Sequence, residues 1–570
     1  MIKEEFVQAA IGEVPVDLLL KNGKLINVLS SRIVQVDVAI YKGYVVGFGD
    51  YKSKEVIDLK GKYIAPGFIE GHIHIESSMV TPERFALSVV PRGTTTVIAD
   101  PHEIANVLGI DGIKYMVESA KIVPLNLFIM IPSCVPATSM ETSGAVLDHK
   151  TIEILLKEEW AIGLAEMMNF PGVIYRDKEV MAKLKAANGK VIDGHAPMLR
   201  GKELSAYIGA GIRSDHETIS LEEAQEKLDK GMFLMIREGS TAKNLKTLFP
   251  VITKENNWRI MVVSDDLHPE DIVEKGHLDY HISLLIKEGL DVITALKMVT
   301  INPATYFRLY DLGAVAPGYR ADMVILSDLE NFTPTMVIKD GEKVAENGIL
   351  LKSVKPFKGE IPENSVFMGT VTPDQFRIPA KSEKARVIEV IPGQIITKQK
   401  ILPIKIEGDV ALPDLDKDIL KVAVIERHKE TGNIGLGFVK GFGLKKGAIA
   451  SSVAHDSHNI VIIGTNDMDM FYAAMELASQ GGGLVAIEDG AVIDVLPLPI
   501  AGLMSDKPVE TLKDQLKSLH KAVREMGCSL PDPFMAMSFI ALPVIPELKI
   551  TDKGIVDVNK FEIVELFVKE

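Results

Sequence analysis

Between residues 66 and 310, short apolar runs alternate with longer stretches whose charged residues recur at helical spacing. Eight of the apolar runs have the length of strands, and the stretches between them keep Leu, Ile, Met or Val on one face. The predicted strands span residues 64–75, 95–99, 127–131, 161–166, 190–193, 211–214, 232–236 and 259–264. The predicted helices include residues 104–119, 178–187, 221–230 and 279–288. Eight such units predict an α/β fold, the (β/α)8 or TIM barrel.

The two flanks of this region share a different pattern. Residues 1–65 hold short strand-like runs separated by Gly, Asn and Lys, and the same pattern returns at 321–326 and 335–341. We therefore expect residues 311–351 to complete the sheet that residues 1–65 begin, which would bring the ends of the middle domain together. The prediction is a composite β-sandwich domain, 1–65 plus 311–351, flanking a metal-dependent catalytic barrel, 66–310.

The remainder of the chain follows a segment rich in Lys, Pro and Glu at 352–364, which is typical of a linker. Beyond it, glycine-rich stretches accompany a strand-like run at 459–463 and a helical stretch at 509–526. We predict an additional C-terminal α+β domain over 365–570. Three structural units suit 570 residues at about 100 to 200 residues per domain.

Composition narrows the setting and the partners. The 63 basic and 78 acidic residues give a net charge of −15, which argues against a nucleic-acid partner. Only two cysteines, Cys134 and Cys528, are present, so a disulfide scaffold and a four-cysteine zinc site are excluded within one chain. The acidic residues near the N-terminus do not fit an export signal. We therefore expect a cytoplasmic protein.

One uncharged stretch, residues 122–140, is long enough to span a bilayer. It contains Pro124, Pro132 and Pro136, which interrupt a helix. We predict a buried strand at 127–131 that runs into a loop, and no membrane association.

Side chains that can bind metal ions stand at the ends of five of the eight predicted strands. They are His72, His74, Glu166, His195, His216 and Asp265. Two histidines two positions apart on a strand point to the same side, and the carboxyl ends of barrel strands are where catalytic groups gather. Any one of these residues alone would more often be a capping or hydrogen-bonding group than a metal ligand. Together, four imidazoles and two carboxylates predict a pair of divalent cations, with Glu166 bridging them and Asp265 bound to one beside the nucleophilic water.

The same residues carry a resemblance. Residues 66–74 (PGFIEGHIH), the later His195, His216 and Asp265, and residues 313–322 (GAVAPGYRAD) resemble the amidohydrolase superfamily. More narrowly, residues 72–79 (HIHIESSM), 94–103 (TTTVIADPHE) and 454–459 (AHDSHN) resemble the bacterial and archaeal adenine deaminase family, nearly end to end. Many superfamily relatives bridge two metals with a carboxylated lysine after the fourth strand. The adenine deaminase family is similar to the present chain in having a glutamate at the end of the fourth strand, which is Glu166 in this sequence.

The resemblance implies a reaction. Adenine would be deaminated hydrolytically to hypoxanthine and ammonia, in purine salvage, by a hydroxide bridging two Mn²⁺ or Fe²⁺ ions, with Zn²⁺ as an alternative. Asp265 can take the proton of the attacking water and pass it to the leaving amine. A second group must protonate the ring nitrogen, and Asp100 and Glu238 are the candidates. The alternatives are a helix N-cap for Asp100, and a loop charge or an ion pair with Arg237 for Glu238.

Further polar residues are candidates for substrate binding: Glu76, Ser77, His102, His455 and His458. A loop with helix-capping serines would explain the first two equally well. The cluster at 454–459 is either a surface turn or an inter-domain contribution to the active-site mouth. The remaining histidines are interpreted as ordinary surface or helix residues: His149, His268, His277, His281, His428 and His520.

Three alternative functions fit the sequence less well. A binuclear hydrolase of cyclic amides, such as hydantoins or dihydropyrimidines, favours a lysine carbamate where Glu166 stands. A barrel that serves only as an assembly module would lack ligands, whereas all six are present. A cytidine-deaminase type of site needs a Pro-Cys-x-x-Cys segment, which two isolated cysteines cannot supply. The expected partners are adenine, water and, in a homo-oligomer, further copies of the chain.

Overall fold

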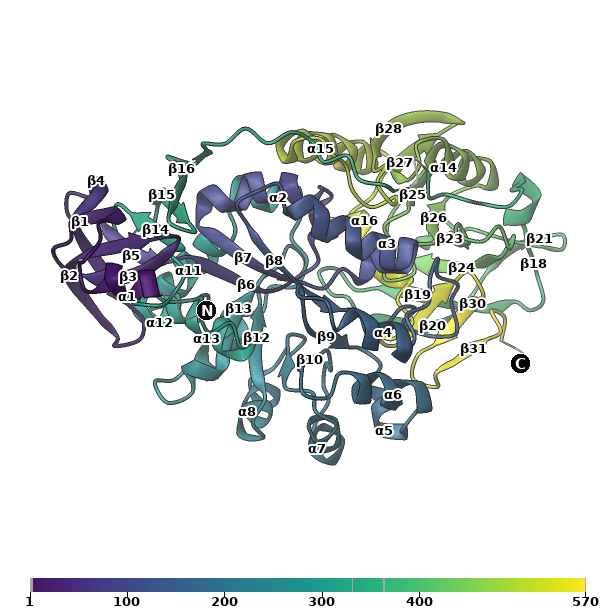
Figure 1. Ribbon diagram of the computed structural model, residues 1–570. Helices are drawn as coiled ribbons and strands as arrows, with labels where there is room; N and C mark the ends of the chain where they lie inside the picture. Colours follow the sequence, from purple (N-terminus) through teal and green to yellow (C-terminus); the bar gives the residue numbers. More distant parts are fainter. Residues whose placement is uncertain (1–3, 331, 362–363, 569–570) are drawn as a thin grey trace.

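The structure is a computed structural model that describes residues 4–330, 332–361 and 364–568 (Figure 1). A closed barrel lies in the middle, with a β-sheet at one end and the C-terminal domain at the other. The barrel strands are β6 (Phe68–Ile73), β7 (Thr94–Ala99), β8 (Asn126–Ile131), β9 (Ala161–Met167), β10 (Val191–Gly194), β11 (Ser214–Asp215), β12 (Phe233–Arg237) and β13 (Ile260–Val263).

These strands form two parallel sheets, β6 to β10 and β11 to β13, that meet at both edges. Between β10 and β11, the Arg213 N–H donates to the Ile192 carbonyl at 3.1 Å. Between β13 and β6, the Asp265 N–H donates to the His72 carbonyl and the His74 N–H to the Asp265 carbonyl, each at 3.0 Å. The predicted (β/α)8 fold is confirmed, and the second closure joins two strands that carry predicted metal ligands.

Helices surround the barrel, and their sequences fix where they begin. Asp177, Ser220 and Asp291 each accept a hydrogen bond from a backbone N–H of the first turn, which satisfies an otherwise unpaired donor. The helices are α2 (Pro82–Val89), α3 (His102–Ala120), α4 (His149–Leu155), α5 (Phe170–Tyr175), α6 (Lys178–Ala186), α7 (Gly201–Gly209), α8 (Leu221–Asp229), α9 (Leu245–Leu248), α10 (Pro269–Glu274), α11 (Leu278–Lys287), α12 (Val292–Lys297) and α13 (Ile301–Tyr306). Short 3₁₀ helices are η1 (Ile75–Ser78), η2 (Val90–Arg92), η3 (Phe249–Val251), η4 (Asn257–Arg259) and, later in the chain, η5 (Pro373–Phe376).

A nine-stranded sheet draws its strands from both flanks of the barrel. It contains β1 (Val16–Asn27), β2 (Arg32–Tyr41), β3 (Tyr44–Phe48), β4 (Ser53–Asp58), β5 (Tyr63–Pro66), β14 (Met323–Leu326), β15 (Pro334–Lys339), β16 (Glu342–Glu346) and β17 (Ile349–Leu350), and α1 (Glu4–Ala10) precedes it. The long strand β1 pairs with β4 along its first half and with β5 along its second half. Residues that precede the barrel and residues that follow it share one apolar core, which includes Leu20, Ile40 and Ile325.

The structure corrects the first predicted barrel strand. Residues 64–75 form two strands, because β5 pairs with β1 and β14 while β6 pairs with β7. Gly67 separates them, and a Cβ atom there would lie only 2.2 Å from the Thr95 hydroxyl oxygen. Both strands are buried, so their apolar residues run on without a break in the sequence.

The C-terminal domain is built on an eight-stranded mixed sheet in the order β20-β19-β24-β23-β26-β25-β27-β28. Its strands are β19 (Lys384–Val390), β20 (Thr397–Pro403), β23 (Ile419–Ile425), β24 (Ile434–Lys440), β25 (Ala448–Ser451), β26 (Ile460–Gly464), β27 (Gly483–Glu488) and β28 (Ala491–Pro497). Two small sheets contain β18 (Ile378–Pro379), β21 (Lys405–Glu407) and β22 (Val410–Leu412), and β29 (Leu548–Thr551), β30 (Gly554–Asp557) and β31 (Glu562–Val564). The helices are α14 (Asp467–Ser479), α15 (Val509–Glu525) and α16 (Pro533–Ile540).

The C-terminal domain packs against the barrel through α15, which contacts α10 and α2. Phe534 and Met537 of α16 belong to the same core cluster as Ile75 and Val107 of the barrel. The uncharged stretch at 122–140 contains strand β8, as predicted. Among the described residues, no helix is long and apolar enough to cross a membrane.

Candidate active site

The six predicted metal ligands converge on one buried point at the carboxyl ends of the barrel strands. Glu166 lies at the centre of the group. Its Oε1 atom is 3.4 Å from His74 Nε2, and its Oε2 atom is 2.7 Å from His195 Nδ1 and 3.0 Å from His216 Nε2. Each carboxylate oxygen therefore faces a different set of imidazoles.

Asp265 lies next to the two histidines at the end of the first barrel strand. Its Oδ1 atom lies 3.4 Å from His72 Nε2 and 3.0 Å from His74 Nε2. The backbone of Asp265 has a φ of 60°, in the left-handed region that costs energy for a residue other than glycine. The backbone hydrogen bonds to His72 and His74 hold it in this conformation.

Local backbone contacts also place His195. The preceding residue, Gly194, packs so closely against the next strand that a Cβ atom would lie 2.3 Å from the Ser214 carbonyl oxygen. The Tyr207 hydroxyl accepts the His195 N–H at 3.1 Å and donates to the Met167 carbonyl at 2.8 Å. A glycine and a buried tyrosine thus tie the fifth strand end to the fourth, where Glu166 stands.

The electrostatics of the cluster are those of closely paired opposite charges. Burial would raise the pKa of Glu166, but His216 and His195 hold it well below its usual range. Burial would lower the pKa of His216, but Glu166 and Asp265 raise it to about 10. The carboxylates thus favour a cation at this point, whether it is an imidazolium or a metal ion.

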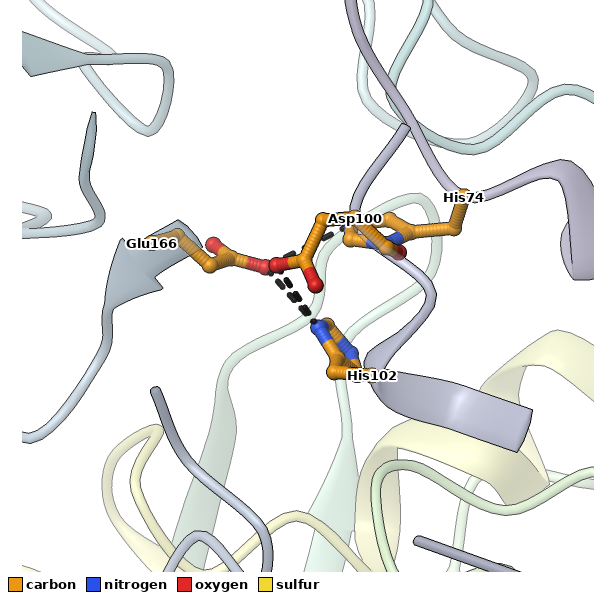
Figure 2. A group of neighbouring side chains, drawn as sticks. All are labelled: His74, Asp100, His102 and Glu166. Atoms are coloured by element: carbon orange, nitrogen blue, oxygen red, sulfur yellow. Dashed lines mark hydrogen bonds and ion pairs between the residues drawn. The ribbon is translucent and has the colours of Figure 1, made fainter. Parts of the chain in front are cut away.

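Several buried polar atoms of the cluster have no hydrogen-bond partner. They are His72 Nε2, His195 Nε2 and His216 Nδ1. Such atoms are rare in folded proteins unless an ion or a ligand satisfies them. Three overlapping groups have donor atoms close enough for a metal ion: His72, His216 and Asp265; Glu166, His195 and His216; and His74, Asp100, His102 and Glu166, the last drawn in Figure 2. The nitrogen and oxygen donors fit divalent manganese, iron or zinc.

Comparisons with known proteins agree with this geometry. Residues 63–344 match the "Amidohydrolase family" and residues 394–562 match the "Adenine deaminase C-terminal domain". "Adenine deaminase 2" of Carboxydothermus hydrogenoformans is 50% identical over 98% of this chain and 99% of its own length. "Adenine deaminase" of Desulfatibacillum aliphaticivorans is 51% identical over 100% of both chains.

The chain belongs to the adenine deaminase family. A solved structure described as an adenine deaminase has a TM-score of 0.45, with 19% identity over 58% of this chain and all of the other.

Three charged residues that were not predicted as site residues face the proposed metal ligands. They are Arg237, Asp266 and Glu217. Arg237, the last residue of β12, lies with Nη1 2.5 Å from Asp265 Oδ2 and Nη2 2.6 Å from Asp266 Oδ2, and it also pairs with Glu217. Burial would raise the pKa of Asp265, but Arg237 and His216 keep it well below its ordinary range. All three stand at strand ends, so the positional rule that selected the ligands would also have found them.

The structure does not bring Glu238 to this site. Residue 237 is the last of its strand and faces the ligands, so the next side chain points away. Glu238 Oε2 accepts the Leu245 N–H at 3.2 Å and lines a separate small cavity with Lys243 and His281. The predicted alternative of an ion pair with Arg237 is also wrong, because Arg237 pairs with Asp265, Asp266 and Glu217.

Asp100 and His102 lie beside the ligands, as Figure 2 shows. Asp100 Oδ2 is 3.2 Å from His102 Nδ1, and the Asp100 carbonyl oxygen is 2.8 Å from His74 Nδ1. The alternative of a helix N-cap for Asp100 is wrong, because Pro101 occupies the N-cap position of α3 and no side chain caps this helix. The Asp100 Oδ1 atom has no hydrogen-bond partner.

Glu76 and Ser77 are buried behind the ligands. Ser77 Oγ donates to Asp266 Oδ1 at 2.6 Å and also lies 3.1 Å from Glu103 Oε1. Glu76 Oε1 accepts the Ile104 N–H at 3.2 Å, and burial, with repulsion from Glu103, raises its pKa to about 8. Both side chains are thus engaged by neighbouring protein groups.

The cluster at 454–459 is buried and not a surface turn. His455 stacks on Phe539, with ring centroids 4.8 Å apart, and Asp456 Oδ1 lies 3.6 Å from His102 Nε2. His458 turns back into its own loop, where Nδ1 accepts the Ala454 N–H at 3.1 Å. The C-terminal domain therefore brings His455 and Asp456, but not His458, to the barrel site.

A cavity of about 600 Å³ lies between the barrel and the C-terminal domain. Glu217, Phe539 and Ile545 line both this cavity and the pocket around the metal ligands. The shared residues place the cavity beside the cluster.

The six histidines interpreted as surface or helix residues differ in their settings, and His149, His281 and His520 lie in helices, as predicted. Four of them are buried: His268, His277, His281 and His520. His277 Nε2 lies 3.2 Å from Glu70 Oε2, and Asp532 lies 3.3 Å from His268 and 3.6 Å from His520. His428 is half-buried, with Nε2 2.6 Å from the Ser457 carbonyl oxygen, and His149 pairs with Glu179. The periodicity of apolar residues in the sequence does not reveal which histidines are buried and paired with a carboxylate.

Proposed function

We propose that the protein catalyses the hydrolytic deamination of adenine to hypoxanthine and ammonia. Identity of about 50% over the whole chain to proteins named adenine deaminase carries the substrate assignment. The buried cluster of imidazoles and carboxylates at the strand ends supports the chemistry. The cyclic-amide alternative loses its support, because Glu166 and not a lysine stands at the fourth strand end.

The six ligands would hold two divalent cations. We assign His72, His74 and Asp265 to one and His195 and His216 to the other, with one Glu166 oxygen facing each set. Bound manganese or iron, or alternatively zinc, would polarise a water molecule for attack on the ring carbon that carries the amine. The neutral form of each imidazole is the one that binds, so metal loading would displace the protons that the carboxylates now favour.

Asp265 is the proposed general base and acid. Its Oδ1 atom faces His72 and His74, and Arg237 fixes its other oxygen. In this position it takes a proton from the attacking water and delivers it to the departing amine. Arg237 keeps the carboxylate ionised before the water is bound, which suits a proton acceptor.

Asp100 is the proposed proton donor to the ring nitrogen. Its unpartnered Oδ1 atom is available to a substrate, while Oδ2 faces His102. Phe539 and His455 offer ring surfaces to the purine, and His102 borders the same pocket. Glu76, Ser77 and His458 would act indirectly, by supporting the groups that line the pocket.

A substrate panel tests this function. The metal-loaded protein should release ammonia from adenine and shift its ultraviolet spectrum to that of hypoxanthine. Hydantoin and dihydrouracil should remain intact, and opening of either ring without turnover of adenine would reverse the assignment.

We also infer the wider setting. Two unpaired cysteines suit the reducing cytoplasm, where free adenine from nucleic-acid turnover would be salvaged. We propose that residues 1–65 with 311–351, 66–310 and 365–570 are the three domains, and that the protein is a homo-oligomer.

A further inference from the structure

A second group of metal-binding side chains joins the barrel to the C-terminal domain. It consists of His102 at the start of α3 and of His455 and Asp456, which precede β26. Asp456 Oδ1 lies 3.6 Å from His102 Nε2 and 3.5 Å from His455 Nδ1. Glu103 Oε1 lies 3.6 Å from the same His455 nitrogen. All four side chains are buried.

The neighbour of His102 selects the ring nitrogen that faces this group. Asp100 Oδ2 lies 3.2 Å from Nδ1, so a proton on Nδ1 is held by the carboxylate. Nε2 then carries the free lone pair and points to Asp456. A carboxylate that orients a histidine through its second nitrogen is the usual support of a metal-bound imidazole.

The surroundings contain more buried carboxylate than the described contacts satisfy. The oxygens Asp456 Oδ2 and Glu103 Oε2, which belong to this group, have no hydrogen-bond partner. Arg237, the cation nearest the binuclear ligands, is already engaged by Asp265, Asp266 and Glu217. An unpaired buried carboxylate is costly, and a bound cation is one way to remove that cost.

We propose that a third divalent cation binds between the two domains, held by His102 Nε2, His455 Nδ1 and Asp456 Oδ1, with Glu103 Oε1 as a further oxygen ligand. Two imidazoles and one or two carboxylates form a donor set that zinc, manganese and iron accept. Donor atoms about 3.3 to 3.6 Å apart are those of a tetrahedral site with bonds of about 2.0 to 2.2 Å. The observed spacings of 3.5 and 3.6 Å match that geometry.

The ion would fasten the C-terminal loop to the barrel beside the proposed active site. His455 Nε2, which has no partner, would remain free to face a substrate. His102 would act through the ion and not on the substrate directly. His102 also adjoins the binuclear ligands, because its Nδ1 atom lies 3.4 Å from Glu166 Oε1. None of the donors assigned to the third ion is among the six ligands of the binuclear pair, so its occupancy does not depend on adenine turnover.

Metal analysis of the full-length protein tests the proposal. Protein saturated with Mn²⁺ and freed of excess metal should carry about three ions per chain, and Asp456→Asn about two. His149→Ala, which removes a histidine on the barrel surface, should retain the parent content. A parent content of about two ions, or an unchanged content in Asp456→Asn, would overturn the proposal.

Anomalous diffraction from Mn²⁺-soaked crystals of the unmodified protein gives a second measurement that needs no variant. A manganese peak should lie within bonding distance of His102, His455 and Asp456, separate from the peaks at Glu166. Peaks at Glu166 alone would overturn the proposal. Because neither readout requires catalysis, an inactive protein with the third peak would refute the proposed function and leave this site standing.

Discussion

Glu70 fixes two of the proposed metal ligands, His72 and Asp265, without lying among them. Its carboxylate accepts the N–H of His72 at 3.1 Å, and the N–H and hydroxyl of Ser264 at 3.2 and 2.6 Å. These bonds tie the strand that carries His72 to the strand end that carries Asp265. His277 Nε2 lies 3.2 Å from the same carboxylate.

Glu70→Gln keeps the shape of the side chain but replaces a charged acceptor with an amide. Burial would raise the pKa of Glu70, but His277 keeps it below its usual value. The stabilisation is therefore present above about pH 4.5 and is lost as the pH falls through the lower folded-state pKa. In metal-free protein at pH 7, we expect the variant to lose about 1 to 3 kcal/mol of stability, and the loss to shrink in acid. Equal melting temperatures at pH 7 would contradict this role.

Glu166 is the ligand on which the two proposed metal positions depend. Glu166→Gln removes the negative charge from the oxygens that face His74, His195 and His216. We expect less bound metal at the binuclear pair and a loss of activity of at least about 100-fold, since removal of the bridge separates the two ions. Unchanged metal content with full activity would refute the assignment.

At the scale of elements, Lys549 on β29 ties together two segments that border the cavity. Its Nζ donates to the Ile395 carbonyl at 3.0 Å and to the Phe539 carbonyl at the end of α16 at 2.9 Å. Both bonds end on neutral groups, and burial lowers the pKa of Lys549 to about 7.

This depressed pKa predicts a pH-dependent stability. The unfolded chain, with an ordinary lysine pKa of about 10.4, binds more protons than the folded chain between about pH 7 and pH 10. Stability should therefore rise with pH across that window through this group. Lys549→Met should remove that part of the rise, as measured by thermal unfolding at pH 7 and pH 9.5. An identical pH dependence in both proteins would show that Lys549 does not titrate in the window.

Element boundaries explain part of what the sequence could and could not predict. The strand-end ligands were predictable because barrel geometry sends every strand's carboxyl end to one face. Arg237 and Glu238 are adjacent, and only the exact end of β12 decides which of them faces the ligands. The split of residues 64–75 depends on which sheet each half joins, and local hydrophobicity does not carry that information.

For the whole molecule, the C-terminal domain forms one wall of the proposed active site. Asp552 accepts hydrogen bonds from the backbone N–H and the hydroxyl of Thr142 at 2.9 and 2.7 Å, and α15 packs against α10 and α2 of the barrel. His455, Asp456 and Phe539 reach the site only through this docking. The motif that contains His455 and Asp456 was visible in the sequence, whereas Phe539 was in no predicted motif. The surface that these residues meet is set by contacts between residues more than 300 positions apart.

The central claim is that this buried cluster makes the chain a metal-dependent adenine deaminase. Chelator-treated protein should be titrated with Mn²⁺ while adenine loss and ammonia release are followed together. We predict no turnover without metal, a rate that rises with bound metal, and equal amounts of ammonia and hypoxanthine. Adenine that remains intact at every metal load, in protein shown to be folded and to bind the metal, would contradict the account.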